Sequence, residues 1–149
     1  MKKFSLIICV LLSLCFGKIQ SQDVKLEVEK IDTRNLENIK VTLTLKNNSL
    51  RKIKYLYMSC SYDEFYLTDN ADLEIIGKVC DKNIPLTLDL ESKSSTRIRL
   101  NLKCNSREKT NFKIGFKLTE VPEIIEIDSA TKSAKLKSKN IWTENIALY

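Results

Sequence analysis

The chain of 149 residues contains no histidine, and it has only three glycines, two prolines and one tryptophan. The lack of histidine excludes the usual catalytic triads, imidazole acid–base catalysis and histidine metal sites. Lysine or a pair of carboxylates would have to carry any catalysis, and no such pair is marked in the sequence. We therefore expect a protein that is not an enzyme and that uses no cofactor.

Only one long hydrophobic run is present, from Phe4 to Gly17. It follows Lys2 and Lys3, an arrangement typical of a secretory signal peptide, and it is shorter than the roughly 20 residues of a membrane span. We predict a signal peptide over residues 1–22, cleaved between 17 and 22. Residues 23–149 would then form a single exported domain, periplasmic or extracellular, without a transmembrane helix.

Cys15 offers a different fate for this segment, because it follows apolar residues as a lipidated cysteine does. Leu14 stands before it, where lipidation sequences resemble one another in having a small residue. A lipoprotein anchored through Cys15 is therefore the minor alternative. In both cases Cys9 and Cys15 take no part in folding.

The net charge of +6 is distributed as single Lys and Arg residues between apolar ones. No compact basic run lies beside stacking aromatic residues, so the sequence gives no support for nucleic acid binding. The basic residues are best explained as the solvated faces of strands.

Strict alternation of apolar and polar residues predicts β-strands. In one such segment Ile98, Leu100 and Leu102 would face a core while Arg97, Arg99 and Asn101 face water. The pattern recurs in residues 24–28, 39–47, 84–90, 96–102 and 111–118. Helical apolar stripes are missing, so we predict an all-β, antiparallel β-sandwich of about seven to nine strands. Closing strands are expected through Leu136, Ile141 and Trp142, with Trp142 as a core anchor.

Three cysteines remain after export, and the compartment is oxidising, so we predict a disulfide between Cys60 and Cys80. Closing this loop would contribute roughly 3 kcal/mol to stability. Pairing of Cys60 or Cys80 with Cys104 stays open at this point. A lone Cys104 would be a buried small residue at a strand end or a dimer contact.

Acidic residues and aromatic residues are both concentrated near this loop. The acids from Asp63 to Glu74 lack the spacing of a calcium loop, and no metal site is predicted. Tyr62, Phe65 and Tyr66 are the predicted binding residues, because a tethered loop can present aromatic side chains to a partner at a small entropic cost. The alternative for the same residues is core packing.

A family resemblance rests on residues 39–49, 52–60 and 84–102. The order of a strand ending in Asn-x-Ser, an aromatic strand and two strands around a polar turn resembles immunoglobulin-like modules of exported bacterial proteins. Residues 59–70 and 80–85 resemble small, uncharacterised secreted proteins of the Bacteroidota type. A more distant likeness is to the BsuPI-type proteinase inhibitor module. The first resemblance implies an immunoglobulin-like sandwich and says little about function.

Two functions follow as expectations. The first is a non-catalytic binding or structural module of the cell envelope that contacts a protein or a glycan through the loop between Cys60 and Cys80. The second is an inhibitor that places the same loop in the cleft of a secreted protease or another hydrolase. The oligomeric state is left open by the sequence.

Overall fold

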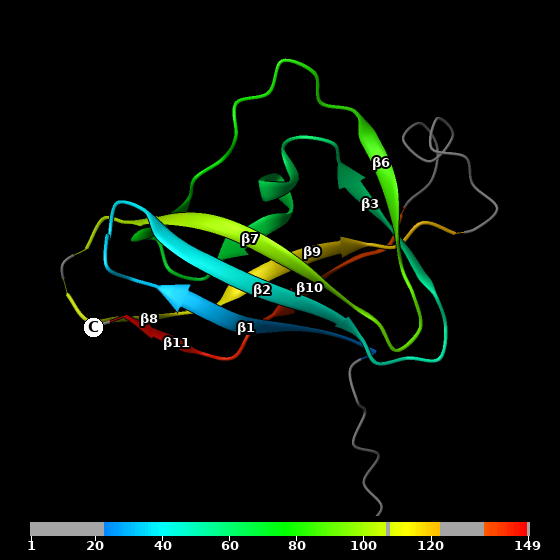
Figure 1. The fold of residues 1–149 in the computed structure, drawn as a ribbon, viewed down its shortest axis with the longest axis horizontal. Coiled ribbons are helices and arrows are strands. Elements are labelled where there is room, and N and C mark those ends of the chain that lie inside the picture. The colour runs from blue at the N-terminus through cyan, green and yellow to red at the C-terminus, as the bar shows by residue number, and fades with distance from the viewer. Residues whose placement is uncertain (1–22, 107, 123–135, 149) are drawn as a thin grey trace, which may run out of the picture.

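The computed structural model describes residues 23–106, 108–122 and 136–148 (Figure 1). The predicted signal peptide and Cys15 lie outside these ranges. The described elements are β1 (Val24–Asp32), β2 (Ile39–Asn47), β3 (Ile53–Met58), the 3-10 helix η1 (Tyr62–Phe65), β4 (Tyr66–Thr68), β5 (Leu73–Ile75), β6 (Pro85–Leu90), β7 (Ser95–Cys104), β8 (Thr110–Phe112), β9 (Ile114–Thr119), β10 (Ser138–Trp142) and β11 (Ile146–Leu148).

The strands form two packed antiparallel layers, which confirms the predicted all-β sandwich. One layer is a sheet with the order β1-β2-β7-β5. The other layer contains the sheets β10-β9-β4, β3-β6 and β11-β8, and a bridge between Tyr55 and Glu120 connects β3 to the end of β9. Buried side chains from both layers form one hydrophobic core, and β1 lies against β10 where the layers meet.

The eleven described strands exceed the predicted seven to nine because long strands are interrupted. Lys113 separates β8 from β9, and a short segment separates β10 from β11. At this interruption Thr143 donates its N–H to Ile114 O (2.9 Å), and its Oγ1 accepts the N–H of Ile114 (3.0 Å). The two broken strands therefore stay paired across the irregularity, and they are shorter pieces of the predicted segments.

Strand β7 confirms the predicted alternation. Leu100 and Leu102 are buried, whereas Arg97, Arg99 and Asn101 are exposed. Ile98 has the same inward orientation and is only partly buried against the core. The inward face of β7 therefore loses its cover toward the start of the strand.

The prediction that Trp142 anchors the core is wrong, because its side chain is 37 % exposed. Trp142 pairs with Gly115 across β10 and β9. A Cβ atom on Gly115 would lie 2.9 Å from the Trp142 ring and 3.1 Å from Leu67 Cγ. The indole thus occupies the space that a side chain at Gly115 would fill, while the neighbouring Ile141 enters the core.

Asn47 is a buried polar residue at the end of β2, with 1 % of its surface exposed. Its Nδ2 donates to three backbone carbonyls, those of Arg51 (2.7 Å), Leu90 (3.0 Å) and Glu91 (3.0 Å). Its Oδ1 accepts hydrogen bonds from the N–H (3.0 Å) and the hydroxyl (2.7 Å) of Ser49. One amide therefore connects the β2–β3 turn to the turn between β6 and β7.

Candidate binding surface

Cys60 and Cys80 form a disulfide with a Cα–Cα distance of 6.1 Å, as predicted. Cys104 is a free thiol, buried at the end of β7, and its S–H donates to Ser106 O at 3.2 Å. The alternative pairings through Cys104 are therefore wrong, and its prediction as a buried residue at a strand end is confirmed. The disulfide joins the segment after β3 to the segment before β6.

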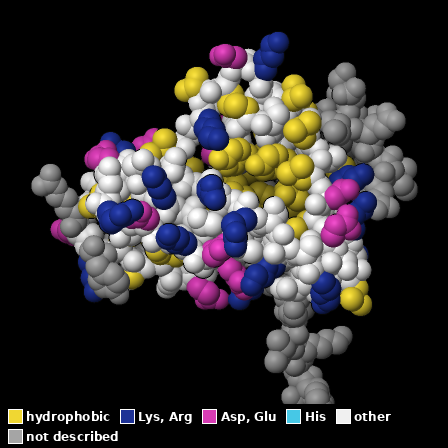
Figure 2. Space-filling view, in the orientation of Figure 1, with side chains coloured by type: hydrophobic (Ala, Val, Ile, Leu, Met, Phe, Trp, Pro, Cys, Tyr) yellow, Lys and Arg dark blue, Asp and Glu magenta, His cyan; other side chains and the backbone are white. Residues whose placement is uncertain are grey.

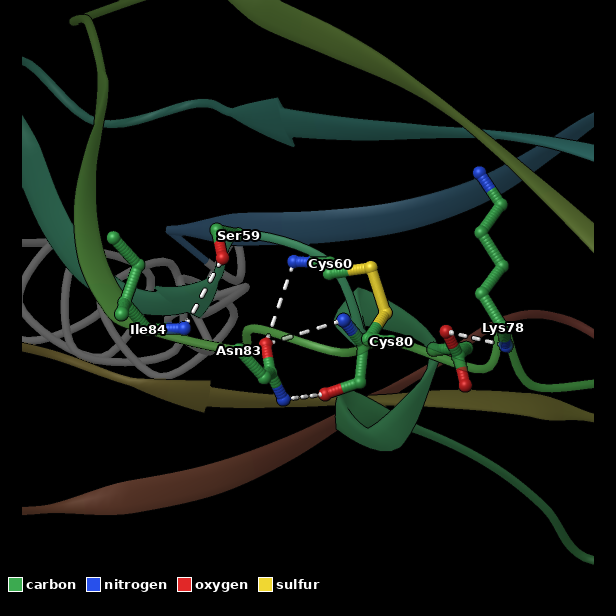
Figure 3. Close-up of a disulfide and its surroundings, with 8 residues drawn as sticks. Ser59, Cys60, Lys78, Cys80, Asn83 and Ile84 are labelled. Atoms are coloured by element: carbon green, nitrogen blue, oxygen red, sulfur yellow. Dashed lines mark hydrogen bonds between the residues drawn. A yellow bond between two sulfur atoms is a disulfide. The ribbon is translucent and has the colours of Figure 1, made fainter.

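Hydrogen bonds reinforce this disulfide on one side of the loop (Figure 3). Asn83 Oδ1 accepts the N–H groups of Cys60 (3.4 Å) and Ser61 (3.3 Å), and Asn83 Nδ2 donates to Ser61 Oγ. Ser59 N–H donates to Ile84 O at 3.0 Å, and Ile84 N–H donates to Ser59 Oγ at 3.1 Å. The two chain segments are therefore held together by the disulfide and by hydrogen bonds that join residues 59–61 to residues 83–84.

Three aromatic rings stack within this tethered region. The Tyr57 ring centroid lies 5.9 Å from that of Tyr62 and 6.3 Å from that of Phe65, with interplanar angles of 8° and 13°. Lys78 Nζ lies 5.0 Å from the Tyr62 centroid, which is within cation–π range. Tyr62 also donates its hydroxyl to Arg99 O at 3.3 Å. The aromatic stack therefore links β3, η1 and the edge of β7.

The three predicted binding residues are not equivalent. Tyr62 and Phe65 are half-buried and keep part of their surface available. Tyr66 is only 6 % exposed, and its ring lies 5.0 Å from that of Phe116 in the core. Strand β4 turns the Tyr66 side chain inward, so Tyr66 packs in the core and is not presented to a partner. Alternation with Phe65 along the sequence was the signal for this difference.

Sequence reasoning missed a group of exposed apolar side chains next to the stack. Among the residues that the structure describes, six large hydrophobic side chains are exposed, and four of them lie between residues 76 and 88. They are Ile76 (39 %), Val79 (101 %), Ile84 (58 %) and Leu88 (37 %). Figure 2 shows a yellow apolar area on this side of the molecule. Exposed apolar side chains gathered on one side of a soluble protein are typical of interaction sites.

The apolar area exists because one side of the sandwich is open. Strand β6 pairs with β3, and Leu86 and Leu88 lie opposite Tyr57 and Tyr55, on the inner face. Within residues 23–106, 108–122 and 136–148, the sheet that would cover this face ends at β7 over most of its length, since β5 pairs only with residues 102–104. Leu88 is therefore exposed although its position in the alternating pattern predicted burial.

A hollow of about 350 Å³ lies at this open side. It is lined by Tyr57, Tyr62, Arg97, Ile98 and Arg99. Arg97 Nε contacts Glu29 Oε2 at 2.6 Å across the outer face of the sheet. The hollow therefore has an aromatic and aliphatic wall, and two arginine residues of the β7 edge complete its lining.

A second hollow on the outer face of the same sheet shares Arg99. Its charged lining consists of Lys30, Lys40, Arg99 and the single acid Asp32. Asp32 is already engaged, because hydrogen bonds from Arg34 lower the pKa of its carboxyl group to about 2. Arg99 thus stands between an apolar hollow and a cationic surface.

The acidic residues of the loop bind the backbone of the loop and its neighbours. Asp63 Oδ1 accepts the N–H of Lys78 at 3.4 Å, and Asp69 Oδ1 accepts the N–H of Lys113 at 2.6 Å. Within the described parts of the chain, no group of three or more Cys, Asp or Glu side chains is placed to hold a metal ion. No helix in the same parts is long and apolar enough to cross a membrane.

Burial raises the pKa of Tyr57 to about 12, with a further contribution from negative charge on neighbouring groups such as Asp63. Tyrosines of an unfolded chain ionise near 10. The folded protein holds this phenolic proton more tightly, so its stabilising contribution is present below pH 10 and is lost as the pH rises through about 12. We expect a late step in an ultraviolet titration of the folded protein that Tyr57→Phe reduces. Titration of every tyrosine near pH 10 in the folded state would contradict this.

No protein-family model and no curated protein matches this sequence. The class of the protein is therefore defined by its own structure, an all-β sandwich with a disulfide-tethered aromatic segment at an open side.

Proposed function

We propose that the protein is an exported, non-catalytic binding module of the cell envelope that contacts a protein or a glycan through the segment between Cys60 and Cys80. The concentration of exposed Ile76, Val79 and Ile84 beside the Tyr57–Tyr62–Phe65 stack carries this proposal. A flexible loop would lose conformational entropy on binding, whereas the disulfide and the Asn83 hydrogen bonds restrict this loop in advance. The disulfide also fits an exported protein.

The proposal includes an immunoglobulin-like architecture. The order β1-β2-β7-β5 supports it, because the four-stranded sheet of an immunoglobulin constant domain places its first, second, fifth and fourth strands in this way. In this alignment β6 is an additional strand paired with β3. The open side next to β6 then distinguishes this module from a closed seven-stranded sandwich.

Inhibition of a secreted protease or another hydrolase is the second candidate. The observation that favours it is Val79, which is fully exposed and directly precedes the disulfide-bonded Cys80. A protruding apolar side chain on a tethered loop has the shape that enters a cleft. The two candidates share the same surface and differ in the kind of partner.

Binding to immobilised extracellular proteins and glycans, together with inhibition of a panel of secreted proteases, tests this function. We expect Val79→Ser with Ile84→Ser to weaken the observed binding or inhibition at least tenfold. Leu50→Ser is the matched control, because Leu50 is 85 % exposed in the turn after β2, away from this loop. An equal loss in both variants, or no loss in the first, would contradict the proposed surface.

A further inference from the structure

We propose that the edge of β7 from Thr96 to Arg99 binds an extended segment of a partner protein as an additional β-strand, and that this segment alternates apolar and acidic side chains. The inference rests on the proposed function, because it assigns the partner's chemistry at the same open side of the sandwich. Strand addition of this kind uses main-chain hydrogen bonds for affinity and alternate side chains for specificity.

The backbone of β7 supplies the free edge. Residues 95–102 pair with β2 on one side, whereas β5 covers only residues 102–104 on the other. Beyond β5, Asn101 O accepts the N–H of Ile76 (2.8 Å) and Arg99 O accepts the Tyr62 hydroxyl (3.3 Å), so both carbonyls point away from β2. Arg97 has the same parity, and its N–H and C=O therefore point to the same free side. Because Ile76 already occupies the carbonyl of Asn101, the edge left for a new strand runs from Thr96 to Arg99, about four residues or roughly 13 Å.

The inner face of the opposite layer supplies the apolar partner surface. Leu86 and Leu88 of β6 continue the inner row formed with Tyr57, and no strand of the described part of the first sheet extends over them. A strand added beside β7 would extend this sheet by one position. Every second side chain of that strand would then lie against Leu88, Tyr57 and Ile98, which explains why these positions are apolar and yet partly exposed.

Charge on the outer face selects acidic residues at the remaining positions of the segment. Side chains of an added strand would lie beside Arg97 and Arg99, because cross-strand neighbours on one face are about 5 Å apart. Arg97 already contacts Glu29, which shows the chemistry that this face accepts. Arg99 shares its hollow with Lys30 and Lys40, and Asp32, the acid of that hollow, is paired with Arg34. A basic or neutral segment would bring no negative charge to this cationic surface.

The probe is a terminally blocked peptide with the sequence Glu-Val-Glu-Val-Glu-Val-Glu, carrying a fluorescent label and titrated by anisotropy. We expect it to bind at least tenfold more tightly than the same peptide with Lys in place of Glu, with an affinity that falls as salt is added. Amide hydrogen exchange at Arg97 and Arg99 should slow on binding. Equal binding of both peptides, or unchanged exchange at both amides, would overturn the proposal.

Backbone methylation of the peptide separates strand addition from charge attraction. Two versions are made, one N-methylated at the valines and one at the glutamates, because only one set of amides faces β7 in a paired strand. We expect one version to lose binding at least tenfold and the other to retain it. Similar affinities for the two versions would overturn the strand geometry.

Protein variants complete the test. Arg99→Glu should weaken the acidic peptide at least tenfold and favour the lysine peptide, whereas Lys117→Glu is the matched control, since Lys117 is exposed on β9 of the other layer. Sedimentation of the protein alone examines a second copy as the occupant. A dimer with Arg97 and Arg99 amides protected in the absence of peptide would overturn the assignment to a partner protein.

The two proposals fail in different ways. Loss of extracellular partner binding in the Val79→Ser and Ile84→Ser variant, without any binding of the acidic peptide, would retain the binding module and reject strand addition. Peptide binding that responds to Arg99→Glu, while Val79 and Ile84 have no effect on partner binding, would retain strand addition and reject the loop as the contact surface.

Discussion

Asn47→Ala is expected to lower the free energy of unfolding by about 3 kcal/mol, because it leaves buried backbone carbonyls without their donor. The side-chain amide of Asn47 donates to three backbone carbonyls, those of Arg51, Leu90 and Glu91. Asn47 is 1 % exposed, so water cannot take its place at these carbonyls. Alanine is too short to replace any of these bonds. Urea denaturation measured at neutral pH gives the free energy directly.

Asn48→Ala is the matched control for this prediction. Asn48 follows in the chain and is exposed, and its backbone, not its side chain, makes the hydrogen bonds to Asp23 and Lys93. Its substitution should change stability by less than about 0.5 kcal/mol. Asn47→Asp should be at least as damaging as Asn47→Ala near neutral pH, because its second carboxylate oxygen would face the three carbonyls. A wild-type midpoint for either Asn47 variant would contradict this account of the turn.

Replacement of both Cys60 and Cys80 by alanine is expected to cost about 3 kcal/mol of stability, since the bridge closes a loop with a sequence separation of 20. The loss arises mainly in the unfolded chain, which gains conformational freedom when the loop is opened. Reduction of the wild-type protein should reproduce the same shift in the urea midpoint. The reduced wild-type protein and the double variant should then have the same urea midpoint.

Cys104→Ala separates the bridge from the general effect of removing a cysteine. Cys104 is buried and free, so its replacement removes only a sulfur atom and the weak hydrogen bond to Ser106 O, at a cost of about 1 kcal/mol. The urea midpoint of Cys104→Ala should also respond to a reducing agent, whereas that of the double variant should not. A reductant effect that persists without Cys60 and Cys80 would contradict the assignment of the bridge.

The alternation of side chains and the cysteine spacing were enough to predict much of this fold. Ile98, Leu100 and Leu102 were placed on the inner face because a strand has a strict period of two, and the structure has them there. The disulfide between Cys60 and Cys80 was predicted from the oxidising compartment expected for an exported protein, although Cys104 left its pairing open. Local periodicity cannot say which strands become neighbours, so the open side beside β6 was not predictable.

The candidate site was predicted only in part for the same reason. Tyr62 and Phe65 were identified from their place in the loop, but the ring that joins them, Tyr57, belongs to β3 and meets them through tertiary packing. Trp142 was misplaced because its environment depends on Gly115 of another strand. Ile76, Val79 and Ile84 are apolar in the sequence, but the sequence does not show that they are exposed. Their exposure depends on where the opposite sheet ends, which is a property of the tertiary structure.

The free edge of β7 also bears on self-association. An uncovered strand edge is a template on which identical molecules can stack and eventually aggregate. If two copies met edge to edge through β7, Arg97 and Arg99 of one molecule would lie next to the same guanidinium groups of the other, and like charges in that position repel. Charge repulsion between these arginines would therefore oppose pairing of two β7 edges. We expect the wild-type protein to remain monomeric at concentrations where the variant Arg97→Thr with Arg99→Thr forms oligomers.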